Sequence, residues 1–141
     1  MLLKYILFKG ERKIMADESR IMIVNALRDK NPKSENFGKV LYADIVADIY
    51  LGCMGYNNGW QELFTKEIDF ELFAENDDEA TREDKYGNIM KEGNIKTIIE
   101  WLENVAPVSL KKYRRIPPFL GLLKGIDPAE WDELHVVHYG Y

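Results

Sequence analysis

Cysteine and histidine are nearly absent from this sequence of 141 residues, which holds Cys53, His135 and His138 and no others of either type. A disulfide framework needs cysteine pairs, and a structural zinc site needs about four Cys or His ligands. Both classes of stabilising site are therefore excluded. Without a pairing partner, Cys53 is expected to be a small core residue.

Long apolar runs are missing as well. The longest one near the start, Leu2–Phe8, is interrupted by Lys4 and closed by Lys9, whereas a membrane-spanning helix needs roughly 20 apolar residues. A secretory signal would need an uninterrupted apolar region followed by a small-residue cleavage site, and residues 10–13 supply neither. We therefore expect no membrane span and a cytoplasmic location.

The residues that carry common enzyme chemistry are also sparse. The only serines are Ser19, Ser34 and Ser109, and none lies in a nucleophile-elbow sequence. No glycine-rich phosphate loop follows a predicted strand. Cys53 has no adjacent cation to favour its thiolate. Nucleotide-binding and acyl-transfer enzymes are disfavoured, and the sequence predicts no cofactor.

The composition that remains is that of an ordinary globular protein. Hydrophobic residues make up 46% of the chain, aromatic residues 12% and charged residues 30%, which excludes a wholly disordered, collagen-like or coiled-coil chain. We predict a single globular domain over residues 1–141. Because Met15 resembles a translation start, residues 1–14 are interpreted as an appended strand or hairpin.

Hydrophobic periodicity favours helices in two segments. In Lys39–Leu51, apolar residues recur at spacings of three and four while Asp44 and Asp48 share the opposite stripe. From Asn94, which can cap a helix, the same rule continues until Pro107 ends it. The fold class predicted is mainly α (α+β): about four to six helices with a short N-terminal hairpin and a C-terminal strand.

For two other segments, the sequence allows either a helix or a strand. A helix capped by Asp17 and running to Arg28 competes with a strand at Ile21–Val24, and the tail after Leu134 fits a helix or a strand. The remaining expectations are a helix at Trp60–Ile68, a solvated loop or frayed helix at Glu75–Asp84, a helical turn at Leu110–Arg115, an extended segment at Pro117–Pro118 and a helix start at Asp127–Glu130.

Charge is unevenly distributed along the chain. The formal net charge is −5, which argues against general nucleic-acid binding because that binding is driven by phosphate neutralisation. The segment Glu67–Glu92 holds ten acidic residues and three cations, whereas Ser109–Lys124 holds five cations and no acid. The molecule should therefore be electrically polarised.

The acidic segment motivates the leading functional hypothesis, a small protein-binding module that blocks a partner with a basic surface. We expect an inhibitor or immunity-type protein of a mobile genetic element, directed at a nuclease or another nucleic-acid-binding effector; a homodimer is also compatible. The candidate partner-binding residues are Asp77, Asp78, Glu79, Glu83 and Asp84, together with the aromatic residues Tyr56 and Trp60.

One short turn is consistent with a mimic of DNA. The segment Tyr56-Asn57-Asn58-Gly59-Trp60 resembles an Asn-Asn-Gly-aromatic turn in one family of bacterial DNA-mimic proteins, with Trp60 in place of that pattern's second glycine. The likeness covers this turn and its immediate neighbours, and it does not assign the chain to that family. It implies an acidic surface that competes for a nucleic-acid groove.

Two alternatives come from other functional classes. In Lys111-Lys112-Tyr113-Arg114-Arg115, an aromatic residue lies among four cations, which could contact phosphates and stack a base in a nucleic-acid accessory protein.

A small metal-dependent hydrolase could use His135 and His138 with Asp132 or Asp44. Zinc sites on helices more often space their histidines by four, and on a strand the two rings would point to opposite faces. The sequence therefore predicts no metal site.

Overall fold

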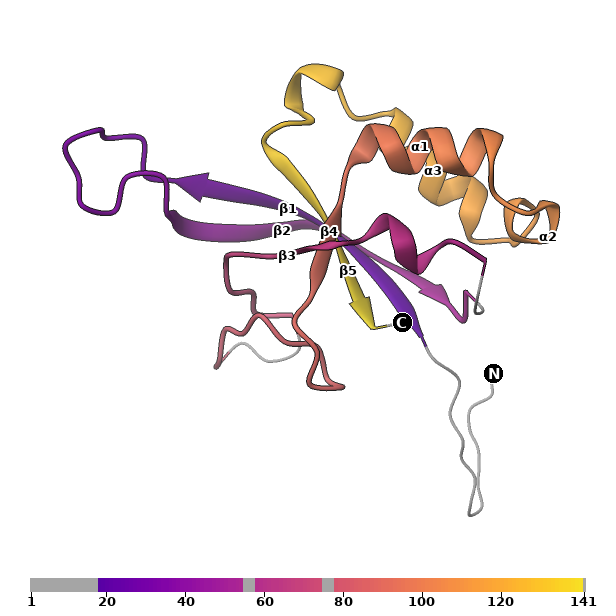
Figure 1. Cartoon of the computed structure of the whole chain (residues 1–141), viewed down its shortest axis with the longest axis horizontal. Coiled ribbons are helices and arrows are strands. Elements are labelled where there is room, and N and C mark those ends of the chain that lie inside the picture. Colours follow the sequence, from indigo (N-terminus) through magenta and orange to yellow (C-terminus); the bar gives the residue numbers. More distant parts are fainter. Residues whose placement is uncertain (1–17, 55–57, 75–77, 141) are drawn as a thin grey trace, which may run out of the picture.

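The protein is built around a five-stranded antiparallel sheet with strand order β2-β1-β5-β4-β3 (Figure 1). This computed structural model describes residues 18–54, 58–74 and 78–140. The hairpin expected in residues 1–14 lies outside these ranges, as do Tyr56 and Asp77. The strands are β1 (Ser19–Arg28), β2 (Val40–Gly52), β3 (Lys66–Glu67), β4 (Lys91–Gly93) and β5 (Leu134–Gly140); the helices are α1 (Ile95–Asn104), α2 (Val108–Lys111) and α3 (Ile116–Lys124), with short 3-10 turns η1 (Gln61–Leu63) and η2 (Pro128–Glu130).

Strand β1 is an inner strand because both of its faces are apolar. Residues 21–24 are all buried, and successive side chains of a strand point to opposite faces. Ile21 and Ile23 pack with the helices, while Met22 and Val24 pack with segment 68–90. A continuous apolar run is typical of a strand covered on both sides. The strand reading of Ile21–Val24 is therefore confirmed, and the helix from Asp17 to Arg28 is wrong.

The sheet separates two hydrophobic cores. On one face, α1, α2 and α3 cover a core around Trp60 and Phe119 (Figure 1). On the other face, Phe70 and Met90 pack against β1 and β5. The segment that supplies this second core is largely irregular, and isolated bridges such as Leu72 with Thr81 hold it together.

The prediction of a mainly helical domain is wrong. Helices hold 25% of the described residues and strands 33%, so the sheet is the larger element. Segment Lys39–Leu51, expected to be a helix, contains strand β2, and Trp60–Ile68 contains only the turn η1 and strand β3. Among the described residues, no helix is long and apolar enough to cross a membrane.

The spacing of apolar residues in β2 resembles that of a helix because the strand contains bulges. Its register with β1 skips Leu41, Val46 and Leu51, so the side chains on either side of each skip change faces. Same-face residues such as Val40 and Ala43 are therefore three positions apart across a skip, and apolar spacings of three arise without a helix. The β-branched and aromatic residues of VLYADIVADIYLG were the better signal.

The helix predicted from Asn94 is confirmed as α1, whereas the signals at Pro117–Pro118 and Asp127 have other outcomes than expected. Asn94 caps α1, accepting a hydrogen bond from the Thr97 backbone N–H at 3.0 Å, as predicted. Pro117 and Pro118 do not force an extended segment; they lie in the first turn of α3, where no intrahelical N–H bond is lost. Asp127 starts only the short turn η2, after which the tail forms β5, one of its two predicted states.

Candidate functional site

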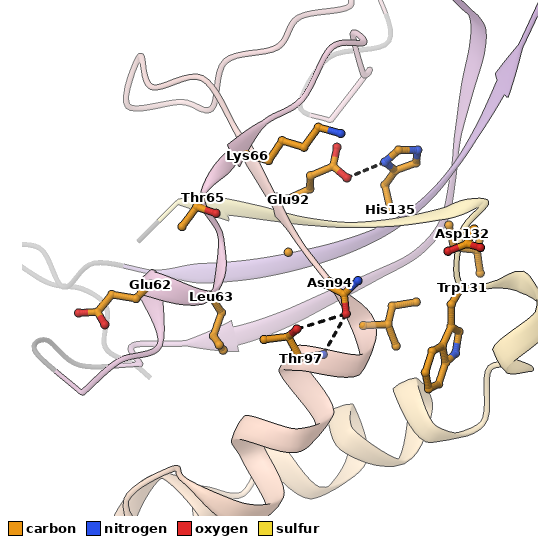
Figure 2. Close-up of a pocket in the computed structure, with 13 residues that line it drawn as sticks. Glu62, Leu63, Thr65, Lys66, Glu92, Asn94, Thr97, Trp131, Asp132 and His135 are labelled. Carbon is orange, nitrogen blue, oxygen red and sulfur yellow. Dashed lines mark hydrogen bonds and ion pairs between the residues drawn. The ribbon is translucent and has the colours of Figure 1, made fainter. Parts of the chain in front are cut away.

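A cleft of about 510 Å³ opens where β4 leaves the sheet (Figure 2). Strand β4 pairs with residues 136–138 of β5 and then turns into α1, so Leu134 and His135 have no β4 partner. The rest of the lining comes from residues 62–66, the first turn of α1 and Trp131–Asp132. Gly93 is required at this junction because a Cβ atom there would lie 2.6 Å from the Leu63 carbonyl oxygen.

The most buried polar contact of the cleft joins His135 to Glu92. The His135 Nδ1 lies 2.8 Å from the Glu92 Oε1, and both side chains are nearly buried. The edge of the imidazole contacts Phe70, at 5.0 Å between ring centroids. With Nδ1–H donating to the carboxylate, the neutral ring presents Nε2 as an acceptor.

Glu92 has hydrogen-bonding capacity left over. Its second oxygen, Oε2, is buried and has no hydrogen-bond partner among the described residues. Lys66 is the cross-strand neighbour of Glu92 and lies on the same side of the sheet (Figure 2). The arrangement is a hydrogen-bonding corner. Within the described ranges, no hydroxyl or thiol is hydrogen-bonded to His135, so no Ser–His or Cys–His pair is formed there.

The two histidines do not converge on a metal. His138 lies on the helix face of β5, stacked on Phe64 with 4.8 Å between ring centroids, whereas His135 contacts Phe70 on the opposite face. Asp44 lies on β2, which β1 separates from β5. No group of three or more His, Cys, Asp or Glu side chains in the described part of the chain could hold a metal ion.

Sequence reasoning missed the contact between Ser19 and His138. The Ser19 Oγ lies 3.0 Å from the His138 Nε2, and both residues are buried. Because the hydroxyl is fully enclosed, we interpret this contact as a structural link between β1 and β5. The opposite correction applies to Cys53, which is exposed rather than in the core.

The predicted acidic face is only partly a surface. Asp78, Glu79 and Glu83 are exposed. Asp84 is buried, and its Oδ1 accepts hydrogen bonds from the backbone N–H groups of Tyr86 and Asn88 at 2.9 and 3.1 Å. Asp84 therefore holds a turn and is not part of a docking surface.

The aromatic candidate Trp60 is a core residue. It is fully buried among Phe64, Trp101 and Phe119. Its predicted contact with a partner is incompatible with this position, because no part of the ring reaches the surface.

Three residues of the cationic segment 111–115 make contacts within the chain. Lys111 donates to the Glu103 carbonyl at 3.0 Å, and Tyr113 packs against the helix-side core. Arg115 lies over the Tyr50 ring, 4.8 Å from its centroid. Lys112 and Arg114 are exposed. The aromatic ring that was expected to stack a base is thus turned inward.

Among the described residues, the largest concentration of exposed apolar side chains lies on the β1–β2 hairpin. This hairpin extends beyond the helices (Figure 1). Leu41, Tyr42 and Val46 of β2 are 60%, 61% and 60% exposed, and Leu27 and Phe37 are each 56% exposed. The β1 register skips three residues of β2, which are Leu41, Val46 and the buried Leu51. Two of the bulges thus leave an exposed apolar side chain, Leu41 or Val46, without a cross-strand neighbour on β1. We call the five exposed residues the hairpin surface.

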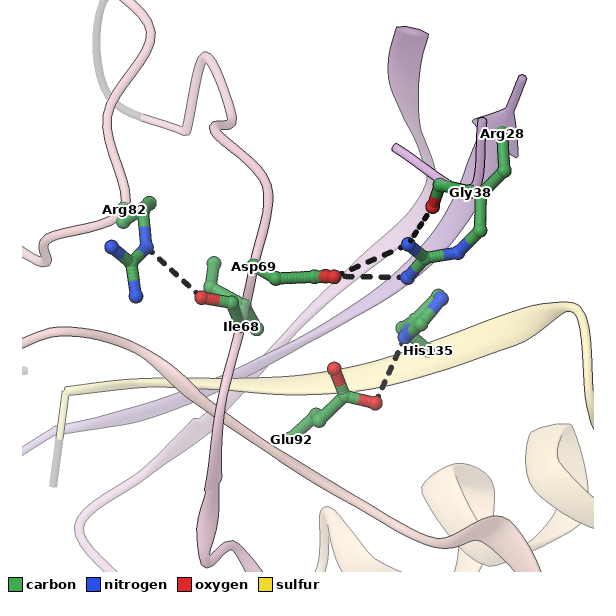
Figure 3. Close-up of polar contacts among 7 residues, drawn as sticks. All are labelled: Arg28, Gly38, Ile68, Asp69, Arg82, Glu92 and His135. Carbon is green, nitrogen blue, oxygen red and sulfur yellow. Dashed lines mark hydrogen bonds and ion pairs between the residues drawn. The ribbon is translucent and has the colours of Figure 1, made fainter. Parts of the chain in front are cut away.

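Polar contacts fix the hairpin to the rest of the molecule (Figure 3). Arg28 bonds both carboxylate oxygens of Asp69 at 3.2 Å and the Gly38 carbonyl at 3.0 Å. The Arg28 hydrogen bond lowers the pKa of Asp69. Burial, followed by the hydrogen bond that its hydroxyl donates to Glu18, raises the pKa of Tyr50 to about 12.

Comparison with known proteins gives no further guide, since no family model, curated protein or solved structure matches this chain. The hairpin surface and the Glu92–His135 contact are therefore interpreted from geometry alone. Sequence reasoning singled out His135 but neither Glu92 nor the hairpin. The exposed positions follow from an edge strand and its bulges, which the helical reading of residues 39–51 concealed.

Proposed function

We propose that this protein is a protein-binding module that docks its partner on the hairpin surface. The observation that carries the proposal is the exposure of Leu41, Tyr42 and Val46 along one edge strand. Single exposed apolar residues are normal on soluble proteins, whereas a cluster marks an interaction site. The proposal keeps the expected class of function and moves the docking surface from the acidic segment to the hairpin.

The identity of the partner stays a prediction. A basic partner remains favoured by the net charge of −5. An inhibitor or immunity-type role, an origin in a mobile genetic element, mimicry of DNA and a cytoplasmic location are expectations that nothing in the fold tests. The exposed acidic residues Asp78, Glu79 and Glu83 are a second candidate surface.

The test is a pull-down with the tagged full chain, washed at low and then high salt. Leu41→Lys combined with Val46→Lys should abolish capture of a stoichiometric partner. The matched control is Val105→Lys combined with Val108→Lys, because those side chains are 65% and 64% exposed at the helical end of the molecule. The control should retain the partner.

A third variant separates the two candidate surfaces. Asp78→Lys with Glu79→Lys and Glu83→Lys reverses exposed charge without touching the buried Asp84. Loss of the partner in this variant, together with retention in the hairpin variant, would overturn the proposal and favour the acidic face. Recovery of the bait alone would count against a protein-binding role.

A further inference from the structure

The outer edge of β2 offers backbone groups as well as side chains. The strand has 13 residues, lies at the end of the sheet and pairs only with β1 within the described residues. An edge strand presents a row of unpaired N–H and C=O groups that can template another strand. Short length, Lys and Pro residues or bulges usually block such an edge. Strand β2 contains neither Lys nor Pro, and residues 42–45, between two of its bulges, pair regularly with β1.

The open part of this edge has a defined end. Arg115 donates a hydrogen bond to the Tyr50 carbonyl at 3.4 Å, and its guanidinium covers the Tyr50 ring. At Gly52, a Cβ atom would lie 2.6 Å from the Tyr113 hydroxyl, so the α2–α3 region closely covers the end of β2. The accessible edge therefore lies before Tyr50, alongside Leu41, Tyr42 and Val46.

The negative charge of β2 favours a basic partner segment at this edge over a second copy of the chain. Strand β2 carries Asp44 and Asp48 and no cation. Asp48 is already bonded to Arg20, whereas Asp44 is exposed and has no ion pair in the described part of the chain. A second copy of the chain would bring the same two carboxylates to the edge, and like charges across a strand pair are destabilising.

We propose that the partner adds an extended segment to the outer edge of β2, and that this segment alternates apolar with basic side chains. The inference rests on the proposed protein-binding function. Main-chain hydrogen bonds to β2 would provide affinity, because strand addition works through the backbone. An apolar side chain would cover Leu41, a Lys or Arg would lie opposite Asp44, and the aliphatic stem of the next Lys or Arg would lie against Val46.

Synthetic peptides test this mode directly with the full-length protein. The probe is a short fluorescent peptide that alternates valine and lysine; its comparators carry glutamate for lysine, or N-methyl groups on alternate amides. We expect the lysine peptide to bind about tenfold more tightly than the glutamate peptide. The N-methylated peptide should not bind, because it cannot complete the ladder.

Variants of the protein assign the contact to β2. Asp44→Asn should weaken binding of the lysine peptide about two- to fivefold, the range for one partly exposed ion pair. Glu130→Gln, an exposed carboxylate of η2, is the control and should leave binding unchanged. Leu41→Lys with Val46→Lys should abolish binding, and hydrogen exchange should show slower amides in β2 when the peptide is bound.

Failure of this inference differs from failure of the proposed function. If the natural partner depends on Leu41 and Val46 while all three peptides bind equally or not at all, the hairpin surface stands and strand addition is wrong. If the protein sediments as a dimer and the Leu41→Lys, Val46→Lys variant sediments as a monomer, the occupant of the β2 edge is a second copy of the chain. If Ile6→Pro makes the peptide bind more tightly, residues 2–8 of the same chain compete with the peptide for the β2 edge.

Discussion

The two edges of the sheet are treated in opposite ways. Strand β3 has two residues, Lys66 and Glu67, both charged, and β3 and β4 are connected to the core by close contacts at Gly93 and Glu92. Strand β2 has 13 residues and exposes apolar side chains. Natural sheets usually block their edges with short or charged strands. One edge of this sheet is therefore protected, and the other is left open.

This difference assigns stability to one edge of the sheet and partner binding to the other. Substitutions at Glu92 and Gly93 of the β3–β4 edge should cost stability, because Glu92 is bonded to His135 and Gly93 lies close to the Leu63 carbonyl. Substitutions on the outer side of β2 should cost binding and little stability. We expect larger effects on the free energy of unfolding at the protected edge than on the exposed side chains of the open one.

At the protected edge, the largest effect is expected from Gly93→Ala. The new Cβ would lie 2.6 Å from the Leu63 carbonyl oxygen and 3.0 Å from the Phe64 ring, so the backbone must move. We expect a loss of about 2 kcal/mol or more in urea unfolding. Gly121→Ala in α3 is the control, because nothing lies within 4 Å of its Cβ position and alanine favours a helix. Equal stability of the two variants would contradict the close approach at Gly93.

Glu92→Ala should be the next most destabilising change. It removes the acceptor of the nearly buried His135, which leaves an imidazole N–H unpaired and costs about 1–3 kcal/mol. Glu67→Ala on the neighbouring strand is exposed and should be nearly neutral. Thermal unfolding of both variants measures the difference. A neutral Glu92→Ala variant would mean that the contact contributes nothing to the protected edge.

A smaller effect is expected where the hairpin joins segment 68–90. Arg28 lowers the pKa of Asp69, so Asp69 contributes stability above the unfolded carboxyl pKa of 3.8, and this contribution is lost as the pH falls through the folded value. Because both side chains are partly exposed, Asp69→Asn should cost only about 0.5 kcal/mol at neutral pH. The difference from the parent should vanish in acid. Urea unfolding at both pH values measures it, with Glu71→Gln as control; a cost independent of pH would exclude the ion pair as its source.

The smallest effect on stability is expected on the open edge. Leu41→Lys with Val46→Lys should change the free energy of unfolding by less than about 0.5 kcal/mol, since both side chains are exposed. On the same strand, Leu51→Ala should cost about 2–5 kcal/mol because Leu51 is fully buried. A large loss in the lysine variant would show that the hairpin surface is covered within the chain itself.

Local signals in the sequence predicted the parts of the fold that local physics determines. Asn94 caps α1 because its side-chain oxygen reaches the Thr97 N–H three residues later. Asp127 starts η2 in the same way, because its side chain accepts a hydrogen bond from the Ala129 N–H and Pro128 occupies the first position of the turn. The apolar run at Ile21–Val24 contained the correct alternative, a strand buried on both faces.

The rest depends on contacts between distant residues. Bulges opposite β1 shift the alternation of β2, and no single-strand pattern shows where a partner strand will skip a residue. Glu92 meets His135 across 43 positions of sequence. Asp84 and Trp60 looked like surface candidates by type, but the turn and the core that enclose them become visible only in three dimensions.

The place of β5 within the sheet also affects how the protein is made. Ser19 of β1 bonds His138 of β5 across 119 positions, and β5 lies between β1 and β4. On a ribosome that adds about 10 residues per second, β1 waits on the order of ten seconds for this neighbour. During that time, the segments that cover both faces of β1 are made, but the edge of β1 that pairs with β5 stays open. The sheet can therefore be completed only when the last strand emerges, and folding should be slow for a protein of this size.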